Sequence, residues 1–219
     1  GAGTAAAYTD QAYADAGEVA ESLQPDEPVF CFSASELKSR AQQFLTLFPG
    51  LVTYAVKCNP EPGVLRALWA GGARHFDCAS PAEIAMVRTM FPDAAIHFMH
   101  PVKARGAIRA AWERYGVRDF VLDSADELAK IRSEIGSDGD LGLVVRLAMP
   151  KGPAVLDLSG KFGAEPEAAA ELLRAALRDI RFDPHAIADT HRLASFIVER
   201  GLLPRWQADK LLQGRHKGF

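Results

Sequence analysis

The stretch LVTYAVKCNPEPGVLRALWAGGARHFDCASPAEI, residues 51–84, contains two strand patterns with a helix pattern between them. The run 51–57 is rich in β-branched and aromatic residues, and the run 73–79 is a second short, largely apolar segment. Between them, apolar residues recur three or four positions apart in PGVLRALWAGG, as in an amphipathic helix. The stretch predicts a strand that ends on Lys57, then a helix, then a second strand.

The same alternation continues along the chain. Further strand patterns lie at 94–100, 118–123 and 141–148, with centres about 22 residues apart, which leaves room for one helix and two short loops. Strands that alternate with helices form parallel sheets with right-handed crossovers. Because no Gly-x-Gly-x-x-Gly motif accompanies them, this α/β pattern favours a (β/α)8-type, TIM-like barrel over a dinucleotide-binding sheet.

Helix boundaries carry their own signals. A serine followed three positions later by a glutamate predicts a capping box, and glycine is common just past a helix end. The predicted boxes are Ser33–Glu36, Ser80–Glu83 and Ser124–Glu127, and the predicted helix-ending glycines are Gly71, Gly116 and Gly136.

Polar side chains stand where the predicted strands end, at the mouth where barrels of this type carry their chemistry. These residues are Lys57, Asp77, Cys78, His100, Asp123 and Arg146. A lysine, an aspartate and an arginine at one mouth predict a site for an anionic cofactor. By itself, a lysine at a strand tip is more often an exposed surface charge, and Asp77 could instead cap the following turn.

Composition and charge narrow the functional class. A formal charge of −3 gives no sign of a nucleic-acid-binding surface, and no apolar run approaches the ~20 residues of a membrane span. The first residues lack the pattern of a signal peptide. Cys31, Cys58 and Cys78 are odd in number and show no metal-ligand spacing. They fit a reducing compartment better than a disulfide scaffold, so we expect a cytoplasmic protein. His97 and His100 would face opposite sides of a strand, so no metal site is predicted.

Four segments also carry a family resemblance. They are residues 54–84, FMHPVK at 98–103, FVLDSADELAKI at 120–131, and VVRLAMPKGPAVLDLSGKFGAEPE at 144–167. They resemble the barrel domain of pyridoxal-phosphate-dependent decarboxylases of the ornithine/diaminopimelate type, which share their fold type with alanine racemase. The resemblance covers about residues 28–178 and implies decarboxylation of a basic amino acid to an amine and carbon dioxide.

The resemblance assigns residues to the cofactor, pyridoxal 5'-phosphate. The residues that match cofactor-binding positions are Lys57, Ala55, Asp77, Arg146 and Glu83. Lys57 matches the lysine that forms a Schiff base with the cofactor, and Ala55 matches a small residue under its ring. Glu83 is also explained as part of a capping box.

The resemblance also bears on Lys161 and His100. Lys161 in LSGKFG matches a lysine at a dimer interface, so the resemblance implies a homodimer with shared sites. The family often carries asparagine where His100 stands, which leaves the role of His100 open.

The resemblance ends before the C-terminus. We therefore predict an N-terminal arm (1–27), a partial cofactor-binding barrel (28–178) and a helical segment (179–219). Apolar residues spaced along 193–212 predict a helical hairpin in that last segment. The hairpin resembles the helical segment upstream of planctomycete-like bacterial Ser/Thr kinase domains, or is a generic hairpin over a sheet edge.

The sequence alone leaves three functions open. The first is the decarboxylase itself, although without the later barrel strands we expect the chain to bind the cofactor weakly. The second is an inactive or cofactor-carrying barrel fragment that acts in association. The third is a regulatory piece of a kinase-like signalling protein.

Overall fold

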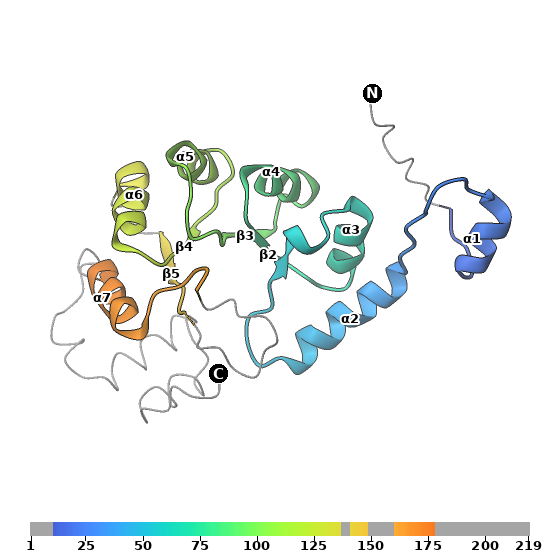
Figure 1. Ribbon diagram of the computed structural model, residues 1–219, viewed down its shortest axis with the longest axis horizontal. Helices are drawn as coiled ribbons and strands as arrows, with labels where there is room; N and C mark the ends of the chain where they lie inside the picture. The colour runs from blue at the N-terminus through green and yellow to red at the C-terminus, as the bar shows by residue number, and fades with distance from the viewer. Residues whose placement is uncertain (1–10, 137–140, 149–159, 178–219) are drawn as a thin grey trace.

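Five parallel strands form one sheet in the computed structural model, which describes residues 11–136, 141–148 and 160–177 (Figure 1). The strands are β1 (Tyr54–Ala55), β2 (His75–Cys78), β3 (Ala95–Phe98), β4 (Asp119–Leu122) and β5 (Gly142–Val145). Their spatial order follows the chain, and each neighbouring pair is parallel. This order is that of a barrel wall built by successive strand–helix units.

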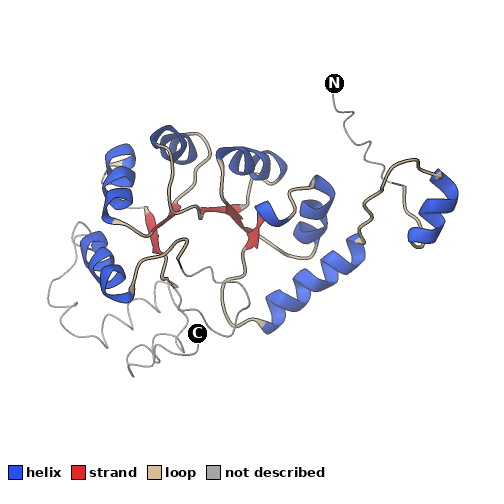
Figure 2. Cartoon of the chain, viewed as in Figure 1, coloured by secondary structure: helices blue, strands red, loops and turns tan. Residues whose placement is uncertain are grey.

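The helices that follow the strands lie on one side of the sheet. Figure 2 shows the strands as an arc with α3 to α7 along its convex side. The helices are α1 (Ala16–Leu23), α2 (Ala34–Leu47), α3 (Pro62–Ala70), α4 (Pro81–Met90), α5 (Arg105–Glu113), α6 (Ala125–Ile135) and α7 (Pro166–Leu177), with a 3-10 turn at Val56–Cys58. The predicted α/β barrel fold is confirmed as a partial barrel of five strands in the described residues, where a complete one has eight.

The main core lies between the strands and these helices. Phe76, Phe98 and Phe120 point from β2, β3 and β4 into one buried cluster, where Ile84 and Ile131 approach from α4 and α6. Burying one such phenylalanine side chain contributes roughly 1.5–3 kcal/mol. Side chains alternate along a strand, so the residues on either side of each phenylalanine in its strand face the opposite, concave side of the sheet.

The first and last strands are shorter than predicted. The pattern at 51–57 predicted one strand, but only Tyr54–Ala55 pairs with β2, and the chain then turns through Val56–Cys58. A strand extends only as far as its partner, and β1 lies at the edge of the sheet. At the other edge, β5 ends at Val145, after which Leu147 forms an isolated bridge with Ala164.

The predicted serine caps are confirmed. Ser33, Ser80 and Ser124 accept hydrogen bonds from backbone N–H groups three residues on, at 3.2, 3.3 and 3.3 Å. Glu83 also reaches back, although its Oε2 accepts from Ala79 N, one residue before the cap, at 2.8 Å. In the Ser124–Glu127 box, the predicted return bond from the glutamate to the cap residue is wrong, because the carboxylate of Glu127 pairs with Lys103 and Lys130 instead.

The glycines end helices for two reasons. At Gly136, the C-cap of α6, φ is +83°, a conformation that disfavours other residues. At Gly71, which follows α3, a Cβ atom would lie 2.7 Å from the carbonyl oxygen of Lys38 and 2.8 Å from the Ala41 side chain. The missing side chain therefore lets α2 and α3 pack closely.

The sequence predicted an arm at the N-terminus and a helical segment at the C-terminus. The predicted N-terminal arm contains α1, which is capped by Asp15 and has no buried residue. The predicted helical segment at 179–219 lies outside the described residues. Within the described part of the chain, no helix has the length and apolar character required to cross a membrane.

Candidate functional site

The first strand and its turn place Ala55 and Lys57. Ala55 is half-buried, and its Cα is paired with that of Asp77 on β2. The 3-10 turn that follows carries Lys57 out of the sheet to an exposed position. The hydroxyl of Tyr54 donates to the carbonyl of Asn59 at 3.2 Å and so ties the far end of this turn to the strand.

Asp77 is the electrostatic centre of the strand ends. Its carboxyl is half-buried, and burial raises its pKa, as does the negative charge of Glu83. The positive charges of Lys57, His97 and Arg146 lower that pKa. Groups from the turn after β1, from α4, from β3 and from the end of β5 therefore act on one carboxyl. This brings together four of the residues predicted from the sequence: Lys57, Asp77, Glu83 and Arg146.

Arg146 directly follows β5 and is held by its backbone. Its N–H donates to the carbonyl of Leu122 and its carbonyl accepts from Ala164 N, both at 2.8 Å. Its exposed guanidinium lies 5.4 Å from the ring centroid of Phe162. Lys161 Nζ lies 5.5 Å from the same ring, so two positive charges border Phe162.

His100 joins this group from the end of β3. Its ring lies edge-on to Phe162, with centroids 5.6 Å apart. Its Nδ1 accepts a hydrogen bond from Val102 N at 3.2 Å, which leaves Nε2 to carry the proton of the neutral ring. Asp123, at the end of β4, accepts from Gly163 N at 2.9 Å and so holds the loop that contains Phe162.

Cys78 is excluded from the mouth. It lies on the helix-facing side of β2 and is fully buried, and burial raises the pKa of its thiol to about 12. A thiol in that state is neither a nucleophile nor a metal ligand at neutral pH.

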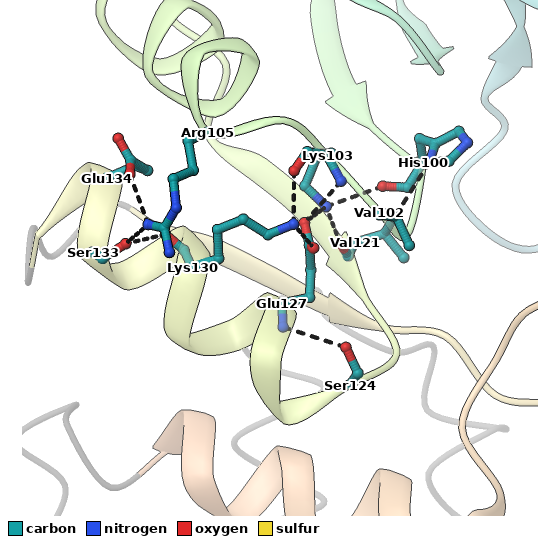
Figure 3. Close-up of polar contacts among 10 residues, drawn as sticks. All are labelled: His100, Val102, Lys103, Arg105, Val121, Ser124, Glu127, Lys130, Ser133 and Glu134. Atoms are coloured by element: carbon teal, nitrogen blue, oxygen red, sulfur yellow. Dashed lines mark hydrogen bonds and ion pairs between the residues drawn. The ribbon is translucent and has the colours of Figure 1, made fainter.

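One buried ionic cluster was missed by the sequence analysis (Figure 3). Lys103 Nζ lies 2.9 Å from Glu127 Oε1 and donates to the carbonyls of Val121 at 2.6 Å and His100 at 3.0 Å. Lys130 Nζ lies 2.5 Å from the other oxygen of Glu127. The cluster fixes the turn after β3, where His100 stands, to the start of α6.

A second polar cluster was also missed. His75, His97 and Asp119 come from three adjacent strands and are joined by hydrogen bonds on the concave side of the sheet. Sequence analysis considered His97 only for a metal pair with His100. In the described residues, no set of three or more histidine, cysteine or acidic side chains is placed to hold a metal ion.

Comparison with known proteins bears on what this site binds. A family model described as "Pyridoxal-dependent decarboxylase, pyridoxal binding domain" matches residues 34–182, more than half of the chain. The chain belongs to this family. The cofactor of the family is pyridoxal phosphate, and the resemblance predicted from the sequence is confirmed.

The relatives agree on the reaction type. An ornithine decarboxylase of Panagrellus redivivus is 36% identical over 153 residues, which cover 69% of this chain and 34% of the relative. A lysine/ornithine decarboxylase of Selenomonas ruminantium is 38% identical over 127 residues, covering 57% and 31%. The chain therefore spans about a third of the length of the curated relatives that it matches.

Solved structures show the same fold. The lysine decarboxylase of Selenomonas ruminantium superposes with a TM-score of 0.63 at 29% identity, over 77% of this chain and 44% of that one. The lysine/ornithine decarboxylase of Vibrio vulnificus, complexed with cadaverine, gives 0.61 at 28% identity, over 85% and 54%.

Proposed function

We propose that this chain supplies the cofactor-binding barrel wall of a pyridoxal-phosphate-dependent decarboxylase that acts on a basic amino acid. The observation that carries the proposal is the convergence at the strand ends of Lys57 and Arg146, whose charges both act on Asp77, in a chain of this family. The substrate class is supported by the relatives, which are named for ornithine, lysine and arginine.

The side chains fit the chemistry of the cofactor, which is an anionic aldehyde on an aromatic ring. Lys57 offers a primary amine, the group that reacts with an aldehyde. Arg146 offers a positive charge, and the small side chain of Ala55 leaves space beside Asp77. We assign these residues to the cofactor, and Glu83 to the support of the loop between β2 and α4.

The bound cofactor supplies an electron sink for the pair released when the carboxyl group leaves. The residues of the chain hold it for that purpose. Lys57 anchors it at the end of β1, where the turn at Val56–Cys58 presents the amine to solvent. Asp77 adds a carboxyl group on which the charges of both Lys57 and Arg146 act, so the site combines positive and negative charge.

Attachment of the cofactor is the test that this chain allows. The full chain is mixed with pyridoxal phosphate, reduced with borohydride, digested and mapped by mass spectrometry. We expect the label on Lys57, and a drop of at least about tenfold in total label in Lys57→Ala, because Lys57 is the lysine whose charge acts on Asp77 at the strand ends. Lys38→Ala, which removes an exposed lysine on α2, is the matched control and should label as the wild type does. Equal labelling of many lysines would refute the proposal.

Assembly and location belong to the same proposal. We assign Lys161 to a homodimer interface, supported by its exposed position in the loop beside Arg146 and Phe162. We propose a cytoplasmic location, supported by the three free thiols.

A further inference from the structure

His75, His97 and Asp119 form a hydrogen-bonded row across β2, β3 and β4. His97 Nδ1 lies 2.8 Å from Asp119 Oδ2, and His97 Nε2 lies 2.9 Å from His75 Nδ1. The two imidazole rings are stacked, with centroids 5.2 Å apart. The row lies opposite the phenylalanine core, because its members alternate with Phe76, Phe98 and Phe120 along the strands.

The hydrogen bonds of His97 allow its charge to change without movement. Nδ1 donates to the Asp119 carboxylate in either charge state. When His97 is neutral, Nε2 accepts from His75, and when His97 is protonated, Nε2 donates to His75, which changes tautomer. Burial, followed by the charge of His97, lowers the pKa of His75, against the opposing effect of Asp119. The lowered pKa disfavours a positive charge on His75.

His97 stands next to Asp77. The two residues are Cα partners across β2 and β3, and His97 is only 7% exposed. A positive charge on His97 favours the ionised form of Asp77, as the direction of its effect on the Asp77 pKa shows. The titratable groups that face His97 are His75 and Asp77 from β2 and Asp119 from β4.

We propose that His97 is a positioning residue of the cofactor site: Asp119 and His75 fix its imidazole beside Asp77, where a positive charge on His97 favours the ionised form of the Asp77 carboxyl. Burial disfavours the ionised form of Asp77, and a positive charge on His97 opposes that effect. The inference rests on the proposed function, since it is that function which gives Asp77 a place at the cofactor.

The coupling is measured without cofactor. Carbon-13 NMR of labelled aspartate side chains in the full chain follows the Asp77 carboxyl from pH 3 to 9. In the wild type we expect a main step for Asp77 and a second, smaller step at the pH where His97 titrates. In His97→Asn, which keeps a donor towards Asp119 and removes the titrating charge, the main step moves to higher pH and the second step disappears.

Controls separate charge from structure. His100→Asn, at the end of the same strand, removes a histidine that does not act on Asp77, and both steps should remain. His97→Gln, which keeps the polar contact towards His75, should behave as His97→Asn does. A merely structural His97 would leave the pH of the Asp77 step unchanged in folded variants, and a wild type without the second step would overturn the proposal.

The two proposals fail in different ways. Loss of Lys57 labelling with an intact coupling would refute the cofactor site and leave the electrostatic pair standing. Normal labelling of Lys57, together with an Asp77 titration that is the same in the wild type and in the His97 variants, would refute the coupling alone.

Discussion

The three cysteines differ in reactivity because the thiolate is the reactive form. Cys31 and Cys58 are exposed, whereas Cys78 is buried and its pKa is raised to about 12. We expect iodoacetamide at pH 8 to modify Cys31 and Cys58 in the folded chain, and Cys78 roughly 1,000-fold more slowly. Mapping by mass spectrometry checks this, with the denatured chain as the control in which all three react. Comparable rates in the folded chain would contradict the buried position of Cys78.

The residues of the mouth could be predicted, but their supporting partners could not. Lys57, Asp77 and Arg146 lie near the ends of strand patterns, and the ends of parallel strands meet by topology alone. The contacts of His97 depend on the register that places Asp119 and His75 beside it, and local sequence does not contain that register. Likewise, the sequence near Lys103 does not predict that its side chain forms a buried ion pair with Glu127.

The pair formed by Lys103 and Glu127 joins β3, β4 and α6. Both side chains are almost fully buried, and their separation is 2.9 Å. Removing one partner leaves the other charge buried and unpaired, so we expect Glu127→Ala to lower the free energy of unfolding by about 3–5 kcal/mol. Urea denaturation followed by circular dichroism measures the loss.

Two matched variants test whether burial of the pair sets the loss of stability in Glu127→Ala. Glu36→Ala breaks a pair with Arg40 that is equally short, at 2.7 Å, but exposed, so its cost should stay below about 1 kcal/mol. The double variant Lys103→Met/Glu127→Leu replaces the buried pair by apolar groups and should recover most of the stability that Glu127→Ala loses. Similar losses for Glu127→Ala and Glu36→Ala would show that burial does not set the cost.

Helix ends were easier to predict than strand ends. A serine cap needs only a side chain and a backbone group three residues apart, so Ser33, Ser80 and Ser124 were identified correctly. The extent of a strand depends on its neighbour, and the pattern at 51–57 therefore predicted more strand than the two residues that pair with β2.

At the scale of the molecule, the sheet has two open edges in the described residues. β1 pairs only with β2, and β5 pairs only with β4. Close to the second edge, the apolar side chains of Val144 and Leu147 are 42% and 50% exposed. Unpaired strand edges with exposed apolar side chains recruit other chains. A closed barrel has no such edge.

We therefore expect the chain to associate with itself through these edges. Val144 alternates with the core-facing Leu143 and Val145, so its side chain faces the concave side. A lysine there places a charge beside the edge and disfavours pairing, so Val144→Lys should weaken association by about tenfold or more. Sedimentation velocity over a range of concentrations should show the average mass of the variant falling towards the 23.7 kDa of one chain. Ala129→Lys adds the same charge on the exposed face of α6 and should associate as the wild type does. A wild type that stays monomeric at every concentration would show that the edges are protected in solution.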